Sequence, residues 1–200
     1  MNLKLSMKVF RYILKVFYQN NELLILKKDK ENYSEENLDS RLQVNLDKLD
    51  HEDIKNINHD LRRKVLEKEL KLNNTILGFI CFDGNIVHYS CIAVSDHKIG
   101  EIEQDFIIPS NSIYIYNCFT EEKYRGLKLF QRMLSSINNM HSSEDKYVAV
   151  SPNNIPSYKA IENVGFYKVA QFKYKKILIW KKLYVRHLNE DLIHAFKQSV

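Results

Sequence analysis

The chain has 200 residues, of which 44% are hydrophobic and 28% charged, and it carries a formal net charge of +5. This size and composition are typical of one soluble domain with a substantial core. The basic residues are spread along the chain and mixed with acids, so a nucleic-acid-binding surface is not expected.

Residues 3–18 have two interpretations. At helical spacing, one face is basic and another apolar, as on a helix lying on an anionic membrane; these faces hold Lys4, Lys8, Arg11 and Lys15, and Phe10, Ile13, Leu14 and Phe17. We prefer a terminal helix or strand packed on the domain, with peripheral membrane contact as the less favoured alternative. Residues 22–28 then predict a short strand.

Residues 34–72 predict two helices. Ser34 can cap the first, in which leucines recur at positions 38, 42, 46 and 49. The second carries an apolar stripe formed by Ile54, Ile57, Leu61, Val65 and Leu70. No proline or glycine interrupts them, so no linker or domain boundary is expected.

From Thr75 the pattern changes to strands. Residues 76–82 and 86–94 flank Asp83-Gly84-Asn85, which predicts a hairpin turn, and residues 101–108 predict a further strand. The rest predicts strand 112–119, helix 127–138, strand 146–150, helix 156–163, a hairpin of residues 166–173 and 176–185, and a short helix from 189. This order predicts a mixed α/β sheet in which strands 112–119 and 146–150 are parallel neighbours.

The candidate site follows these two strands. Arg125 and Gly126 follow the first and Asn154 follows the second, so both lie at one crevice beyond the carboxyl ends. The N-terminus of a helix there offers free N–H groups and a positive dipole to a phosphate. Alone, Arg125-Gly126 would be read as an ordinary turn with an arginine in solvent.

Two motifs at this crevice resemble those of one enzyme family. The segment C-F-T-E-E-K-Y-R-G-L-K-L-F-Q-R-M-L, residues 118–134, resembles the pyrophosphate-binding motif of the GNAT N-acetyltransferase superfamily. The segment N-N-I-P-S-Y-K-A-I-E-N-V-G-F, residues 153–166, resembles that superfamily's second cofactor motif. The resemblance covers residues 75–185 by element order. It implies a mixed, mostly antiparallel sheet with a splayed parallel strand pair, flanked by helices.

The resemblance also implies an acetyl-CoA site. The end of the first strand would pair with the pantetheine arm through the backbone of Cys118, Phe119 and Thr120. The following loop would wrap the pyrophosphate, and the second motif would line the pantetheine; these residues are Arg125, Gly126, Leu127, Lys128, Leu129 and Phe130, then Asn154 and Ser157.

The chain departs from the family pattern at two places. Lys128 and Phe130 occupy loop positions that are usually small, and Ile161 occupies the position of a common tyrosine acid. Tyr158, one helical turn earlier, is our candidate acid. His88 is our candidate general base, because its pKa can fall near working pH; the alternative is a hydrogen-bonded structural histidine.

The three cysteines are Cys81, Cys91 and Cys118, in apolar surroundings, which predicts free buried thiols and a reducing, cytoplasmic location. Cys118 could attack a thioester, but direct acyl transfer is the family's usual route. No cysteine has metal-ligand spacing with a histidine, so no metal is expected. The apolar runs are too short for a transmembrane helix, and no signal peptide is expected.

We therefore expect one acyl-CoA N-acyltransferase-like domain over residues 1–200. Residues 1–74 would supply an N-terminal strand and acceptor-side helices, residues 75–185 the cofactor-binding core, and residues 186–200 a tail. The expected activity transfers an acetyl group to a primary amine of a small molecule, by analogy an amino sugar. The alternative is a catalytically silent CoA-binding sensor or interaction module. The oligomeric state and the acceptor itself are left open.

Overall fold

A computed structural model describes residues 18–30, 43–48, 54–55, 57, 60–69 and 75–196. The N-terminal segment expected to be helical therefore lies outside the described residues, apart from Tyr18. So do residues 34–42 and 49–53 of the first expected helix. Among the described helices, none is long and apolar enough to cross a membrane.

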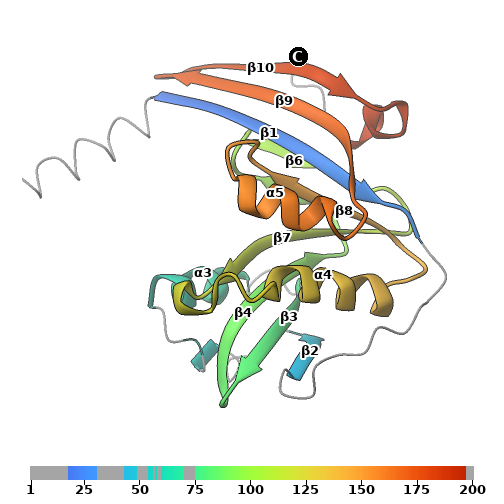
Figure 1. Cartoon of the computed structure of the whole chain (residues 1–200). Coiled ribbons are helices and arrows are strands. Elements are labelled where there is room, and N and C mark those ends of the chain that lie inside the picture. Colours follow the sequence, from blue (N-terminus) through green and yellow to red (C-terminus); the bar gives the residue numbers. More distant parts are fainter. Residues whose placement is uncertain are drawn as a thin grey trace, which may run out of the picture.

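Eight strands form one mixed sheet, drawn in Figure 1. Its order is β10-β9-β1-β8-β7-β4-β3-β2, and every neighbouring pair is antiparallel except β7 and β8. The strands are β1 (Tyr18–Lys28), β2 (Gln43–Lys48), β3 (Thr75–Phe82), β4 (Asn85–Ala93), β7 (Ser112–Thr120), β8 (Asp145–Val150), β9 (Tyr167–Ile177) and β10 (Trp180–Leu188). The predicted fold class, a mostly antiparallel sheet with one parallel pair and flanking helices, is confirmed.

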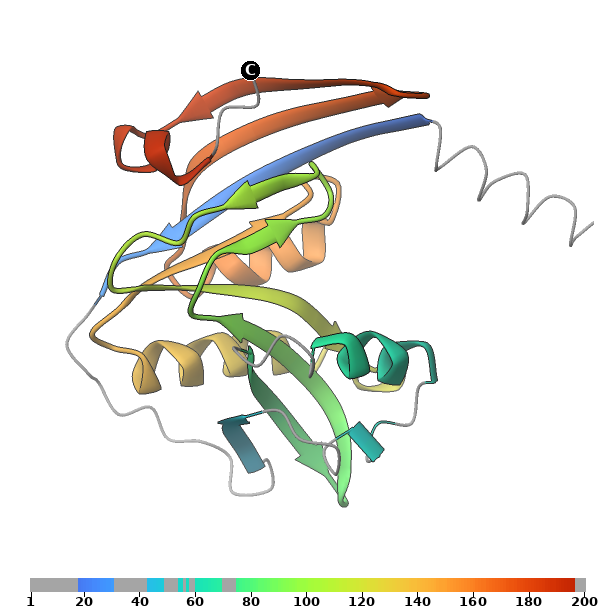
Figure 2. The same cartoon turned by 180° about the vertical axis from the view of Figure 1, so that it is seen from behind.

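Helices α4 (Leu129–Met140) and α5 (Ile155–Glu162) cover one face of the sheet. Their apolar sides, with Met133, Leu134 and Ile161, pack on aliphatic residues of β1, β7 and β8. The strand pair β5 (His97–Ile99) and β6 (Gln104–Phe106) and the short helix η3 (Glu190–Ala195) cover the other face (Figure 2). Helix α3 (Asp60–Glu69) packs through Leu66 against β3 and β4.

Most elements lie where the sequence predicted them, and the turn between β3 and β4 is a clear case. Asp83 and Gly84 both have positive φ, 49° and 74°, as a two-residue hairpin turn of the primed type requires. Strand β1 also occurs as predicted but begins earlier, at Tyr18, because it pairs along almost the whole length of β9.

Three predictions were wrong. Residues 43–48 form strand β2 instead of the first helix, since they pair with β3 and their apolar residues also alternate with period two. The strand expected at 101–108 is only β6, because residues 100–103 turn back to pair it with β5. The closing hairpin turns at Leu178 and Ile179, four residues later than expected, so its first strand is longer and its second strand begins and ends later.

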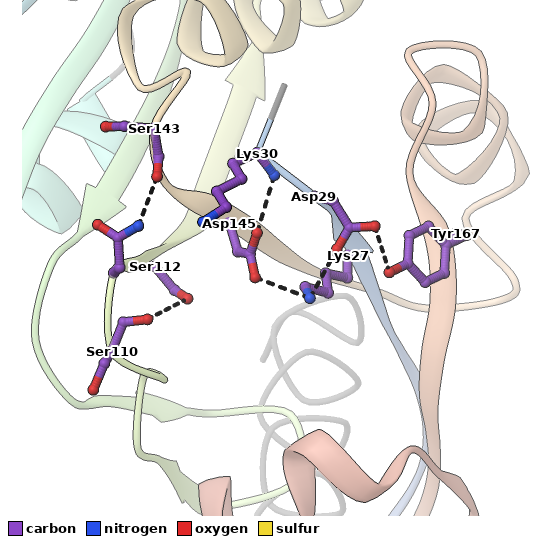
Figure 3. Close-up of polar contacts among 9 residues, drawn as sticks. Lys27, Asp29, Lys30, Ser110, Ser112, Ser143, Asp145 and Tyr167 are labelled. Atoms are coloured by element: carbon purple, nitrogen blue, oxygen red, sulfur yellow. Dashed lines mark hydrogen bonds and ion pairs between the residues drawn. The ribbon is translucent and has the colours of Figure 1, made fainter. Parts of the chain in front are cut away.

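An ion-pair cluster lies at the amino end of β8 (Figure 3). The Lys27 ammonium lies 2.8 Å from an Asp29 oxygen and 2.9 Å from an Asp145 oxygen. The Tyr167 hydroxyl donates to Asp29, and the Lys30 amide donates to Asp145. Burial opposes the charge of Lys27, but the two carboxylates outweigh it and raise the pKa of Lys27. The cluster therefore fastens β1 to β8 and β9.

We expect Asp145→Ala to lower the free energy of unfolding by about 1–3 kcal/mol, because it removes one of the two carboxylates that pair with the largely buried Lys27 and also the acceptor of the Lys30 amide. Urea denaturation followed by circular dichroism measures this change. Lys123→Ala is the matched control: Lys123 is exposed, so its pair with Glu121 contributes little and no measurable loss is expected. Equal losses in both variants would contradict a structural role for the cluster.

Candidate active site

The site exists because β7 and β8 separate. They pair in parallel only from Ser112 with Asp145 to Ile115 with Val148. Asn117 then adopts a positive φ of 46°, and the register of β7 against β4 shifts there, which marks a β-bulge. Beyond the bulge, the backbone groups of β7 that face β8 have no ladder partner among the described strands. Strand backbone along this gap can hydrogen-bond to a ligand with amide groups.

A cleft of about 930 Å³ lies where β7 and β8 separate, and its lining comes from both faces of the sheet. On the side of α4 and α5 it is lined by residues such as Cys118, Phe130 and Ile161. On the side of β5 and β6 its lining includes Leu23 and Tyr116. A ligand that enters from the helical side can therefore present its end to a second molecule on the opposite side.

The N-terminus of α4 forms one mouth of the cleft. Gly126 and Lys128 both have positive φ, 85° and 57°, and the loop bends so that the first turn of α4 meets the cleft. No side chain caps this helix, so its first N–H groups remain available to an anion, with the exposed Arg125 and Lys128 beside them. Lys128 thus adopts the conformation that glycine takes in the family pattern, at a strain of about 1–2 kcal/mol.

The N-terminus of α5 forms the opposite wall. The Asn154 side chain accepts a hydrogen bond of 3.4 Å from the Ser157 amide, which caps the helix. Asn154, Pro156 and Ser157 all line the cleft. The capping bond uses one side of the Asn154 amide group, and its nitrogen remains a donor for a ligand.

Nearly all predicted site residues meet at this cleft. Those that line it are His88, Cys118, Phe119, Thr120, Arg125, Gly126, Lys128, Leu129, Phe130, Asn154 and Ser157. Leu127 is 56% exposed and does not line it. Whether these residues bind CoA stays a prediction, but their convergence from four separate elements agrees with the expected geometry.

Tyr158, the candidate acid, and Cys118, the alternative nucleophile, are both neutral. The Tyr158 hydroxyl donates to Glu162 at 2.5 Å, outside the cleft lining, and this bond raises the pKa of Tyr158. Cys118 donates weakly to the Tyr116 carbonyl, and burial raises the pKa of its thiol to about 12. The geometry therefore favours neither a Tyr158 acid nor a Cys118 nucleophile. Ile161 gives this wall an apolar surface.

His88 lines the cleft and is completely buried. Its Nδ1 lies 2.8 Å from the Thr120 hydroxyl and its Nε2 lies 3.1 Å from the Ser90 hydroxyl. Burial lowers the pKa of His88 to about 3, so the ring is neutral and a weak proton acceptor. These contacts favour the structural alternative, in which His88 orients the hydroxyl of Thr120 at the cleft surface.

The opposite face of the cleft carries a polar cluster that the sequence did not reveal. The Tyr116 hydroxyl donates to Glu69 at 2.6 Å and lies 2.9 Å from the Thr75 hydroxyl. The His97 ring stacks on Tyr116, and the carboxylate of Glu101 also lines the cleft. These residues come from α3, β3, β5, β7 and a turn, so no sequence spacing could have grouped them.

Comparisons with known proteins add the fold family. No protein-family model matches the chain. No curated protein matches it either. Solved structures do match. A protein from Novosphingobium aromaticivorans assigned to the GNAT acetyltransferase family is 12% identical, with a TM-score of 0.55 over 78% of this chain and 63% of that one.

Two further structures give the same result. A GCN5-related N-acetyltransferase-like protein from Streptococcus suis is 15% identical, with a TM-score of 0.53 over 85% of this chain and 66% of that one. A GNAT-family acetyltransferase from Colwellia psychrerythraea is 11% identical, with a TM-score of 0.51 over 86% and 62%. The chain spans about three-fifths to two-thirds of the length of these proteins. The chain therefore has the fold of the GNAT acetyltransferases, as the two sequence motifs indicated.

The burial of neutral His88 predicts a pH-dependent stability. Its pKa is about 3 in the folded state, against 6.5 for a histidine exposed to water in the unfolded chain, so the folded state binds fewer protons between these values. This contribution is complete above pH 6.5 and is lost as the pH falls toward 3, by about 1.4 kcal/mol per pH unit. Urea denaturation at pH 7.5, 6 and 5 should show a shallower loss for His88→Gln than for the unmodified protein.

The exposed His187 supplies the control for this measurement. His187→Gln should follow the pH dependence of the unmodified protein. If His88→Gln also follows it unchanged, His88 is not held neutral in the folded state.

Proposed function

We propose that the chain is an N-acetyltransferase that transfers an acetyl group from acetyl-CoA to a primary amine of a small molecule. The observation that carries this proposal is the cleft between β7 and β8, which crosses the sheet and has the uncapped N-terminus of α4 at one mouth. It offers an anion site, unpaired strand backbone and an opening to the other face, in the order in which CoA presents pyrophosphate, pantetheine amides and thioester.

In this proposal each wall has a distinct partner on the cofactor. The N–H groups at the start of α4, with Arg125 and Lys128, hold the pyrophosphate. The backbone of β7 from Cys118 to Thr120 pairs with the pantetheine arm, opposite Asn154 and Ser157. The apolar Ile161 and Phe130 exclude water around the arm.

The acceptor enters from the face that carries β5 and β6. Its nitrogen attacks the thioester carbonyl carbon, the C–N bond forms, the C–S bond breaks, and the CoA thiolate leaves with the electron pair. The nitrogen then releases a proton, which the thiolate or water accepts, and a neutral amide remains. Glu101 lines the cleft on this side, and its carboxylate can pair with a cationic amine such as an amino sugar. The amine loses its proton to water before attack, because His88 is too weak a base to remove it.

The competing proposal is a CoA-binding module without catalysis. Ile161 stands where a tyrosine acid is common, and the buried titratable groups at the cleft, His88 and Cys118, are neutral. Transfer nevertheless remains chemically feasible, since a thiolate leaves without help from an acid.

Calorimetry with acetyl-CoA, followed by release of CoA thiol with a panel of amines that includes amino sugars, separates these proposals. We expect binding, and thiol release that depends on the amine. Binding without release by any amine would favour the silent module. The absence of binding would overturn both.

Substitutions at Lys128 test the anion site and its strain separately. Lys128→Ala and Lys128→Gly both remove the charge, and each should weaken acetyl-CoA binding by about 1 kcal/mol or more. Only Lys128→Gly relieves the left-handed backbone, so it should also raise the free energy of unfolding by about 1 kcal/mol. Calorimetry and urea denaturation measure the two effects. Unchanged affinity in both variants would place the pyrophosphate elsewhere.

A further inference from the structure

The hairpin of β9 and β10, with β1 paired along it, reaches beyond the carboxyl end of β8. Leu24 of β1 pairs with both Val150, the last residue of β8, and Gln171 of β9. Strand β9 then continues for six residues to Ile177, which pairs with Tyr18. At about 3.3 Å per residue, the hairpin extends about 20 Å past the carboxyl end of β8. Figure 1 shows its tip beside the start of β1, at one end of the sheet.

The projecting tip is apolar and exposed. Four consecutive residues form it, with exposed fractions of 56% for Ile177, 57% for Leu178, 84% for Ile179 and 78% for Trp180. Scattered apolar residues on a surface are ordinary, but a contiguous run of this size at a loop tip marks an interaction surface. Within the described residues, these side chains have no core to pack against.

The turn itself holds these residues at a conformational cost. Leu178 has a φ of 57°, in the left-handed region that favours glycine or asparagine. Two-residue hairpin turns normally carry those residues, and a leucine there is strained by about 1–2 kcal/mol. The sequence thus keeps bulky apolar side chains where a stable turn would have small polar ones. Such an outlier indicates a function other than stability.

Strand register arranges basic residues behind the tip on one face. Tyr18, Ile177 and Trp180 are direct neighbours across β1, β9 and β10, and they share a face. Two positions further along the same face, Lys175 and Lys182 are cross-strand neighbours. Lys173 and Tyr184 form the row after that, so an apolar row is followed directly by lysines.

No carboxylate among the described residues pairs with Lys175 or Lys182, and Glu22, which lies beside Lys173 on this face, pairs with Arg186. Lys175 and Lys182 lie over the Tyr184 ring, at 5.9 and 5.1 Å from its centroid. On the opposite face of the hairpin the situation differs, because Lys176 and Lys181 both pair with Glu103. The uncompensated cations therefore lie on the face that also carries Tyr18, Ile177 and Trp180.

We propose that the β9–β10 tip inserts into the interfacial layer of an anionic lipid bilayer. Tryptophan and tyrosine favour that layer, aliphatic side chains partition below it, and lysines behind the tip are attracted to lipid phosphates. A second copy of the chain fits less well. Two copies joined through this face would bring the lysines of one copy close to those of the other, and Lys181 and Lys182 disfavour pairing with another strand at the β10 edge. This inference does not depend on the proposed transferase function.

Trp180 is the only tryptophan in the chain, so its fluorescence reports on the tip alone. The full chain is mixed with vesicles of phosphatidylcholine, with or without phosphatidylglycerol. We expect a blue shift and protection from acrylamide quenching only with the anionic vesicles, and both should weaken as salt is added.

Two double variants separate the apolar and electrostatic contributions. Leu178→Gly with Ile179→Ser should relieve the turn, keep or raise the melting temperature, and weaken vesicle binding about tenfold or more. Lys175→Glu with Lys182→Glu should abolish the preference for anionic vesicles. Ile193→Ser and Lys64→Glu, exposed residues on η3 and α3, are the controls and should leave binding unchanged.

Three results would overturn the proposal. The first is co-sedimentation with vesicles while Trp180 fluorescence stays unchanged, which would place the contact elsewhere, such as in the basic N-terminal segment. The second is equal binding to neutral and anionic vesicles. The third is a Trp180 shift that follows protein concentration without lipid, which would show self-association through the tip.

Discussion

The separation of β7 from β8 is the constraint on which the rest of the site depends. Two parallel strands that remained paired would bury their backbone groups and close the sheet. Here the bulge at Asn117 ends the pairing after Ile115, so strand backbone faces an open cleft. The same divergence brings the starts of α4 and α5 to opposite sides of one space, because each helix follows one of the two strands.

The interior of the cleft is polar but carries little charge. Burial keeps His88 protonated at one nitrogen only and keeps Cys118 and Tyr116 protonated, since each charged form would lose its hydration there. Charged groups occur instead at the openings, with Arg125 and Lys128 at one and Glu101 and Arg62 at the other. The first mouth therefore attracts an anionic ligand, whereas the second carries one charge of each sign.

Local patterns in the sequence predicted most of the fold and one side of the site. The loop at Arg125-Gly126 and the cap at Asn154 could be found because their chemistry depends on adjacent residues. Strand β2 was missed because leucines at 42, 46 and 49 satisfy a helical period, whereas pairing with β3 decided the outcome. The sequence could not show the burial of His88 or its contacts with Ser90 and Thr120, because these arise only from strand pairing.

The short β7–β8 ladder has a mechanical consequence. Among the described strands, four residue pairs are the entire ladder between the β2–β3–β4–β7 half of the sheet and the β8–β1–β9–β10 half. A long molecule bound between the diverging strands would bridge these halves along the line where the protein itself bridges them least. A bound ligand would then reduce the relative motion of the two halves and slow amide exchange along β7. Ligand affinity and these motions are therefore thermodynamically linked.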